Sequence, residues 1–330
     1  MGRGTVVTFG EGLIRFTPPG GTRMTEARSF TAHPGGAEAN VAVGLASLGT
    51  HARWFSRLPG HAFASSLLHD LRATGVDTST VLLGDGRLGT YYLEPGAGIR
   101  PSSVIYDREA SAFSRLQVDH LTDATLDVVF QDATWFHTTG INLSIANAPV
   151  AAVQRMWDEA GRRGVKRSFD VNLRASLPEA SALLERATPM LGEADVVLVA
   201  ERDVCTWMGQ PRASMEAILA TLGDLAPHAV RIVTRGAGGA TGVNVLGERT
   251  DVPALESLER GRIGRGDAFA AGVLHVLSQA PNPNDAVPRA LRWGVACASY
   301  KSTLDGDLPR LDGDVIARLL EDGLAADVQR

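Results

Sequence analysis

The 330-residue sequence contains only two cysteines, Cys205 and Cys297, and only two lysines, Lys166 and Lys301. Two cysteines cannot form a disulfide framework or a cysteine-rich zinc site. Arginine therefore supplies 30 of the 32 basic residues, and no Gly-Lys-Ser or Gly-Lys-Thr triplet occurs. This excludes a Walker A phosphate loop, which needs a lysine at that place.

Long apolar runs and excess positive charge are also missing. No apolar run approaches the length of about 18 residues that a membrane-spanning helix needs, and the first ten residues do not resemble a signal peptide. The net charge of −5 argues against nucleic acid as the main partner. The histidines lack His-x-x-x-His spacing, and no Gly-x-Ser-x-Gly elbow of a serine hydrolase is present. We expect a cytoplasmic protein with no membrane or nucleic-acid partner.

What the sequence does contain is an alternation of short apolar segments with stretches whose apolar residues recur at helical spacing. Strands that alternate with helices along most of a chain predict a parallel sheet covered by helices on both faces. The predicted strands are Val6–Phe9, Asp195–Val199 and Ala229–Thr234, and the predicted helices are Glu38–Leu48, Val150–Gly164 and Ala268–Ala280.

Residues 11–33 and 87–106 depart from this alternation. Both stretches are rich in Thr, Tyr, Gly and Pro, and neither has helical periodicity. They are typical of β-hairpins inserted into an α/β core, and such insertions often close over a site as a lid. We therefore expect one α/β domain over residues 1–330, with a small β lid formed by these two insertions.

A candidate catalytic segment begins at Gly264, where a Gly-Arg-Gly turn leads directly into an apolar helix. The backbone N–H groups of Gly264, Arg265 and Gly266 would form an anion hole at the positive end of that helix. Asp267 would face a substrate hydroxyl beside the bound phosphate. The alternative is an ordinary glycine-rich turn with Asp267 as a helix cap.

Two further glycine-containing segments could bind small ligands. Gly35 and Gly36 permit close approach of a polar ligand at the start of a helix, and Asn40 in its first turn can donate and accept hydrogen bonds. Gly236 and Gly239 lie between two predicted strands, where a nucleotide could rest against the backbone. The alternatives are an ordinary helix start and a plain hairpin turn.

In this order, these segments resemble the ribokinase-like, PfkB-type carbohydrate kinases, over about Val6 to Pro309. Within that family the 2-keto-3-deoxygluconate kinases are the most similar group. The resemblance implies a ribokinase-like, doubly wound, mostly parallel sheet with helices on both faces and a small β-sheet lid. The segments that carry it, besides Gly264–Gly272, are Gly35–Val43, Arg87–Tyr92, Tyr106–Ala112, Asp170–Arg174 and Lys301–Asp307.

The resemblance also implies roles for individual residues. Arginines at matching positions would bind the carboxylate of a sugar acid in a forked geometry, which favours an acid sugar over a neutral one. ATP with Mg²⁺ would be the phosphoryl donor, and two copies would pair through the lid as a homodimer. The implied substrate residues are Gly35, Gly36, Asn40, Tyr91, Tyr106, Arg108 and Arg174, and the implied nucleotide residues are Gly236, Gly239, Lys301 and Thr303.

The sequence departs from the family pattern at four positions. Gly261 replaces the usual Asp, which puts a monovalent-cation site in doubt, and Arg265 replaces a small residue between the two glycines. The family's Asn-x-x-Glu, associated with magnesium, becomes Ala200 and Asp203, and the shorter carboxylate would reach Mg²⁺ through water. Two alternatives to a sugar-acid kinase remain: a catalytically impaired homologue that binds a sugar acid or nucleotide, and a kinase for a neutral sugar or nucleoside.

Overall fold

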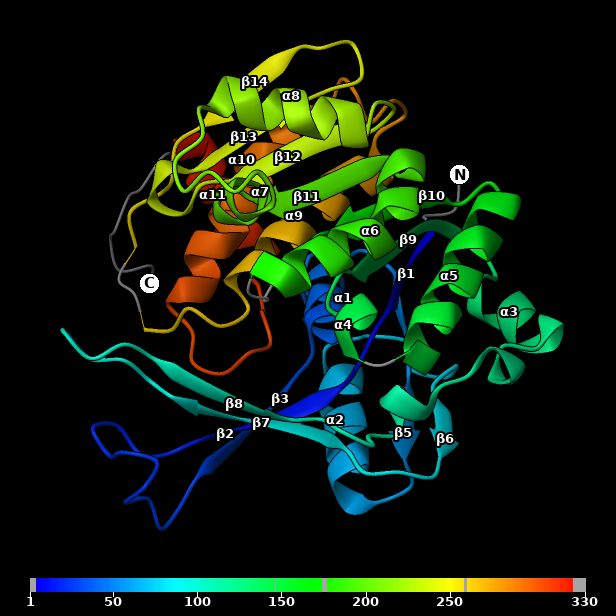
Figure 1. The fold of residues 1–330 in the computed structure, drawn as a ribbon, viewed down its shortest axis with the longest axis vertical. Coiled ribbons are helices and arrows are strands. Elements are labelled where there is room, and N and C mark those ends of the chain that lie inside the picture. The colour runs from blue at the N-terminus through cyan, green and yellow to red at the C-terminus, as the bar shows by residue number, and fades with distance from the viewer. Residues whose placement is uncertain (1–3, 146, 174–176, 258–259, 323–330) are drawn as a thin grey trace.

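The computed structural model describes residues 4–145, 147–173, 177–257 and 260–322. An eight-stranded sheet forms its centre (Figure 1). Six neighbouring strands, β12, β11, β10, β9, β1 and β4, pair in parallel, and β13 and β14 extend the sheet beyond β12 as antiparallel strands. In spatial order the strands are β14 (Arg249–Val252), β13 (Ala240–Val243), β12 (Val230–Thr234), β11 (Val196–Ala200), β10 (Lys166–Asp170), β9 (Ala133–Thr139), β1 (Thr5–Phe9) and β4 (Ala52–Phe55).

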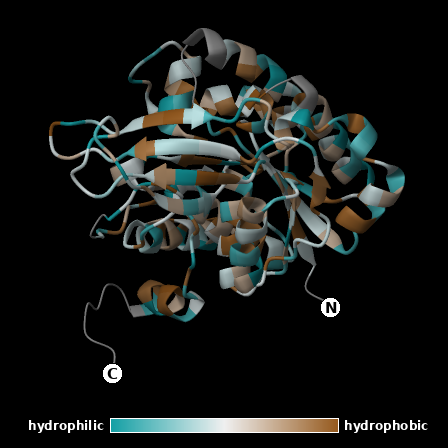
Figure 2. Ribbon diagram, turned by 90° about the horizontal axis from the view of Figure 1, so that it is seen from below, coloured by the Kyte–Doolittle hydropathy of each residue, from teal (hydrophilic) through white to brown (hydrophobic). Residues whose placement is uncertain are grey.

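Both faces of this sheet are buried, which explains why its strands have short continuous apolar sequences. In β11, Val196 and Leu198 pack into the core on one face, while Val197 and Val199 pack into the core on the other. Hydrophobic residues accordingly appear on the central strands between the helices (Figure 2).

Helices cover each face. On one face lie α1 (Ala37–Ser47), α2 (Ala62–Ala73), α9 (Arg265–Gln279) and α10 (Val287–Ser302). On the other lie α3 (Asp123–Val129), α5 (Asn147–Arg162), α6 (Leu177–Glu193), α7 (Glu201–Trp207) and α8 (Met215–Leu225). The short α4 (Asn142–Ile145) follows β9, and α11 (Gly313–Asp322) packs against α10. Within the described residues, no helix is both long and apolar enough to cross a membrane.

A separate four-stranded sheet, called the small sheet below, lies beyond the end of β1 (Figure 1). Its strands, in the order β3 (Thr31–Gly35), β2 (Leu13–Thr17), β7 (Gly89–Glu94) and β8 (Ser103–Asp107), come from the two stretches that lack helical periodicity. A short parallel pair, β5 (Arg57–Pro59) and β6 (Leu82–Gly84), lies outside both sheets. The predicted α/β class, with a mostly parallel sheet and a small β sheet, is confirmed.

The predicted elements also occur close to their expected bounds. The three predicted strands correspond to β1, β11 and β12, and the three predicted helices correspond to α1, α5 and α9. The largest differences are at two helix starts. Helix α5 begins at Asn147 rather than Val150, and α9 begins at Arg265 rather than Ala268, directly after Gly264 in the left-handed conformation.

Candidate active site

A cavity of about 640 Å³ lies between the small sheet and the carboxyl ends of the parallel strands. Ligands bind at this edge in open α/β sheets, because the loops and helix N-termini that follow the strands converge there. Asp170, Ala200 and Thr234 line the cavity from the ends of β10, β11 and β12. Tyr91 and Tyr106 line it from the small sheet.

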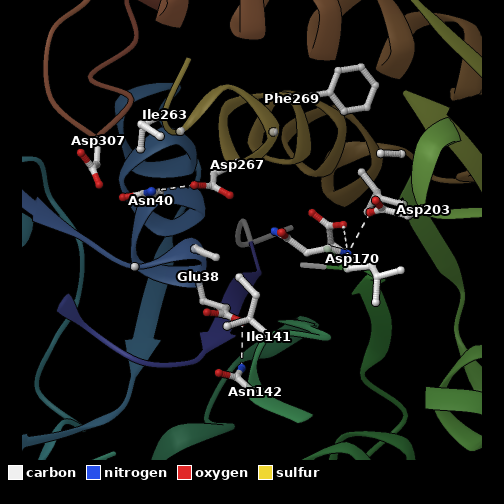
Figure 3. Close-up of a pocket in the computed structure, with 18 of the residues that line it drawn as sticks. Glu38, Asn40, Ile141, Asn142, Asp170, Asp203, Ile263, Asp267, Phe269 and Asp307 are labelled. Atoms are coloured by element: carbon white, nitrogen blue, oxygen red, sulfur yellow. Dashed lines mark hydrogen bonds between the residues drawn. The ribbon is translucent and has the colours of Figure 1, made fainter. Parts of the chain in front are cut away.

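Asp267 lies in the first turn of α9 and points toward α1 (Figure 3). The side-chain amide of Asn40 donates a hydrogen bond of 2.6 Å to its Oδ2. Asp267 is only 6% exposed, and both residues line the cavity. Within the described residues, the buried Oδ1 of Asn40 has no hydrogen-bond partner, which leaves an acceptor for a ligand hydroxyl.

The turn before Asp267 leads directly into the N-terminus of α9. Gly264 has a φ of 79°, and a Cβ there would lie 2.2 Å from the carbonyl oxygen of Asp307, so only glycine fits. Beyond its chain neighbours and the backbone of α9 itself, a Cβ at Gly266 would meet no described heavy atom within 4 Å. The first N–H groups of α9 have no partner within the helix, and its dipole favours an anion beside them.

Glu38, in the first turn of α1, is a buried carboxyl group at the floor of the cavity (Figure 3). Its Oε1 accepts hydrogen bonds from the backbone N–H of Thr139 at 2.9 Å and from the side chain of Asn142 at 2.8 Å. Burial, with a smaller contribution from the negative charge of Asp267, raises the pKa of Glu38 to about 7.

This pKa predicts a pH-dependent stability. A carboxyl group whose pKa is higher in the folded chain (about 7, against an ordinary 4.5) stabilises the fold at low pH, and this contribution is lost as the pH rises through 7. Between about pH 5 and pH 8, the free energy of unfolding of the wild type should therefore fall by about 2–3 kcal/mol relative to that of Glu38→Gln, whose side chain does not titrate. Urea unfolding of both proteins at the two pH values measures this change. A stability difference that stays constant with pH contradicts it.

On the small-sheet side, Arg108 extends into the cavity beside Tyr106, with its guanidinium 5.5 Å from the centre of the ring. Its Nε donates to one carboxylate oxygen of Glu11 at 2.8 Å, and its Nη2 lies 2.6 Å from the same oxygen in an ion pair. Ser111 donates to the other oxygen of Glu11, which is 2% exposed. Within the described residues, Nη1 of Arg108 makes no hydrogen bond, so this nitrogen remains available to a ligand.

Asp307 connects the small sheet to the loop after α10. The Nε of Arg15 on β2 donates to it at 2.6 Å, and the hydroxyl of Tyr91 on β7 donates to its other oxygen. The Arg15 and Asp307 side chains are only 7% and 1% exposed. Burial raises the pKa of Asp307, and the charge of Arg15 opposes this rise.

The far side of the cavity carries two more carboxylates, Asp170 and Asp203 (Figure 3). Asp203 is 4% exposed, and its Oδ2 accepts a hydrogen bond of 3.1 Å from the backbone N–H of Leu173. The Nε of Arg202 lies 3.3 Å from its other oxygen. Asp170 is the last residue of β10, and Asp203 lies in the first turn of α7, which follows β11 directly, so both carboxylates lie at the same edge of the sheet.

The structure brings most of the predicted substrate residues together but separates the predicted nucleotide residues from them. Gly36, Asn40, Tyr91, Tyr106 and Arg108 line the cavity, together with Gly264, Gly266, Asp267 and Asp203. Gly35 instead packs against Asp307, where a Cβ would lie 2.6 Å from Oδ2.

The other predicted residues are not among the described residues that line the cavity. Gly236 and Gly239 form the turn of the β12–β13 hairpin, Thr303 is exposed after α10, and Lys301 is buried behind Gly264. Arg265 occupies the first position of α9. Arg174 falls outside the described residues.

The residues to which sequence reasoning assigned no role include Glu11, Arg15, Glu38, Asp170 and Asp307. Glu11 lies two residues after the end of β1, and a polar residue near the carboxyl end of a parallel strand is a signal that could have identified it. Arg15 and Asp307 are 292 positions apart, and no local pattern connects them.

Comparison with known proteins identifies the family. The model of the pfkB family carbohydrate kinases matches residues 4–308. The chain belongs to the PfkB family. This PfkB carbohydrate kinase is 33% identical over 318 residues to a 2-dehydro-3-deoxygalactonokinase of Haloferax volcanii, which covers 96% of the chain and 97% of the relative.

Solved structures agree with this assignment. A 2-dehydro-3-deoxygluconokinase from Thermotoga maritima is 26% identical to this PfkB kinase, with a TM-score of 0.86 over 97% of this chain and 99% of that one. A fructokinase from Vibrio cholerae, determined with fructose, ADP and a calcium ion, is 25% identical, with a TM-score of 0.82 over 96% and 99%. The ribokinase-like fold and the carbohydrate kinase class expected from the sequence are confirmed.

Proposed function

We propose that this PfkB kinase transfers the terminal phosphoryl group of ATP to the terminal hydroxyl of a sugar acid, 2-keto-3-deoxygluconate or its galactonate epimer. The observation that carries the proposal is a single cavity lined by Asp267 beside a helix N-terminus and by Arg108 on the small sheet. Asp267 is a proton acceptor beside an anion site, and Arg108 is a hydrogen-bond donor for a carboxylate. Kinases named for these two acids, also called 2-dehydro-3-deoxy acids, are among its relatives.

At the reacting end, Asp267 accepts the proton of the terminal hydroxyl while the phosphoryl group is transferred. A weak base is sufficient because phosphoryl transfer has a loose transition state that depends mainly on positioning. Asn40 holds the carboxylate in place through its 2.6 Å hydrogen bond. The backbone N–H groups of Gly264, Arg265 and Gly266 stabilise the charge on the phosphoryl oxygens.

At the other end, Nη1 of Arg108 binds the substrate carboxylate, and Arg174 supplies a second donor. Glu11 fixes the orientation of Arg108 by binding its other two nitrogens. Tyr91 and Tyr106 contact the sugar from the small sheet, and Gly36 contacts it from the start of α1. The small sheet closes over the substrate as a lid and excludes water.

ATP occupies the side of the cavity toward β12, along the turn of Gly236 and Gly239 and near Thr303. The two carboxylates Asp170 and Asp203 suit Mg²⁺, which is usually held by one or two carboxylates, several waters and the phosphates of the substrate. Both line the cavity, so they would hold the ion on this side, Asp203 through water. When bound, Mg²⁺ neutralises charge on the phosphates.

Coupled ADP release tests this function directly. The panel contains ATP and Mg²⁺ with 2-keto-3-deoxygluconate, its galactonate epimer, fructose, ribose and adenosine. The proposal expects turnover on the acids at about 1–100 per second, with kcat/KM well above that for the neutral compounds. If no compound is turned over while a sugar acid or ATP raises the melting temperature, the chain is an impaired homologue that binds these ligands.

A neutral-sugar kinase is the second candidate, because Glu11 compensates the charge of Arg108. The similar Vibrio cholerae enzyme is a fructokinase with bound fructose. A higher kcat/KM for fructose than for either acid would establish this candidate.

A variant of Arg108 distinguishes a sugar-acid kinase from a neutral-sugar kinase. Replacement of Arg108 by Met is expected to raise KM for the sugar acid about 10- to 100-fold, the effect of losing a hydrogen bond to a charged group. The change should barely affect any residual turnover of fructose. Because Glu11 would then be buried without its cation, the double variant Glu11→Gln, Arg108→Met is the appropriate control. Equal losses on acid and neutral sugars in both variants contradict the role of Arg108.

We also propose that two copies pair through the small sheet. The sheet face turned away from the cavity carries an apolar patch of Phe16, Phe30, Tyr92 and Ile105, in which Ile105 is 54% exposed and Phe30 is 39% exposed. Apolar side chains on an open sheet need cover in solution. Sedimentation should show a dimer that Ile105→Lys dissociates, and a monomeric wild type contradicts this.

A further inference from the structure

Lys301, in the last turn of α10, is a lysine with no exposed surface. Its Nζ donates to the carbonyl oxygens of Leu304 at 3.2 Å and Gly306 at 2.9 Å. Both acceptors belong to the loop that leads to Asp307. The side chain therefore reaches back under its own loop and cross-links two of its carbonyl groups.

This ammonium group lies directly behind the anion site. A Cβ placed on Gly264 would lie 3.2 Å from Cε of Lys301, so the lysine stem supports the residue from which α9 begins. The same Cβ would lie 2.2 Å from the carbonyl oxygen of Asp307. The loop after α10 and the Gly-Arg-Gly turn are thus packed together around Lys301.

The charged groups that act on Lys301 lie on β2, on α9 and in the loop after α10. Burial and the charge of Arg15 lower the pKa of Lys301, while Asp307, Asp267 and Asp305 raise it. A cation at this position balances the carboxylates of the site from behind the turn.

The monovalent-cation site implied by the family does not fit these residues. Gly261 replaces the family's Asp, and a Cβ at Gly261 would lie 3.7 Å from the carbonyl oxygen of Leu304. The missing carboxylate would therefore have been beside the carbonyl that Lys301 now binds. A free ion would compete with the ammonium group for the same oxygens.

We propose that Lys301 is a built-in cation that replaces a free monovalent ion behind the anion site and holds the Gly264–Asp267 turn in position for phosphoryl transfer. The proposal rests on the proposed kinase function and deepens it. Lys301 acts through the two carbonyls and the turn, so it is a positioning residue and not a ligand of the nucleotide.

The first test uses the wild type in K⁺, Na⁺ or tetramethylammonium salts at equal ionic strength. Turnover and melting temperature should agree within about 2-fold and about 1 °C, because no ion is needed. Activation by K⁺ of about 5-fold or more, or a clear stabilisation by K⁺, overturns the proposal.

The second test uses variants. Lys301→Met is expected to lower kcat about 10- to 100-fold with little change in the sugar KM, less than the loss of a direct oxyanion donor. Lys301→Ala leaves space for an ion, so K⁺ or methylammonium should restore part of kcat and raise its melting temperature, while tetramethylammonium should not. Adding Gly261→Asp to Lys301→Ala should strengthen the response to K⁺.

Full activity of Lys301→Met, or loss of activity that no small cation restores in Lys301→Ala, overturns the proposal. The melting temperatures report on cation binding even if none of the sugars is phosphorylated. They therefore separate a failure of the role of Lys301 from a failure of the proposed kinase function. If neither variant folds, the response of the wild type to K⁺ still decides.

Discussion

Replacing Asp267 by Asn is expected to lower kcat about 10²- to 10⁴-fold, the contribution of a positioned general base. The variant keeps the size of the side chain, and its amide oxygen can still accept the 2.6 Å hydrogen bond from Asn40. Binding of the sugar and of ATP should therefore persist. The measurements are kcat and KM by coupled ADP release, with calorimetric binding of the sugar.

Asp314→Asn is the matched control. Asp314 is also an acidic residue in the first turn of a helix, α11, but it is exposed and away from the cavity. This variant should keep wild-type kinetics. A loss of less than about 10-fold in Asp267→Asn would contradict the assignment of Asp267 as the proton acceptor.

Replacing Asp307 by Asn is expected to destabilise the protein by about 3–5 kcal/mol, because it leaves the guanidinium of Arg15 buried without its counter-ion. The variant keeps the shape of the side chain and one oxygen acceptor for Tyr91, so the loss of charge dominates. Thermal unfolding should shift downward by about 5 °C or more.

The matched control lies in the same small sheet. Asp107 on β8 pairs with Arg87, but the two side chains are 46% and 42% exposed. Asp107→Asn should therefore leave the melting temperature nearly unchanged, because water screens exposed ion pairs. Equal shifts for the two variants would show that burial is not what makes the Arg15–Asp307 pair important.

Much of the fold could be predicted from local patterns. Strands β1, β11 and β12 are buried on both faces, which requires short apolar runs, and α1 and α9 each begin after a glycine that local sequence identifies. Asn40 and Asp267 were found because each lies in the first turn of such a helix. That their side chains meet across 227 positions was not visible in the sequence.

The rest of the site depends on long-range pairing. Arg108 was predicted as a substrate ligand from resemblance, but its partner Glu11, 97 positions earlier, changes what the guanidinium can bind. Lys301 was assigned to the nucleotide for the same reason, whereas its ammonium group is bound to carbonyls of its own loop. Side-chain direction at such positions is decided by packing, which no spacing in the sequence encodes.

The most direct test of the central claim is the position of the phosphate in the product. The purified kinase is incubated with ATP, Mg²⁺ and 2-keto-3-deoxygluconate, and phosphorus–carbon coupling is measured by NMR. Because Arg108 and Asp267 line the same cavity, we predict coupling to the terminal carbon, far from the carboxylate. Phosphate on the carboxylate or on an internal hydroxyl, or release of free phosphate without a sugar product, would contradict the account.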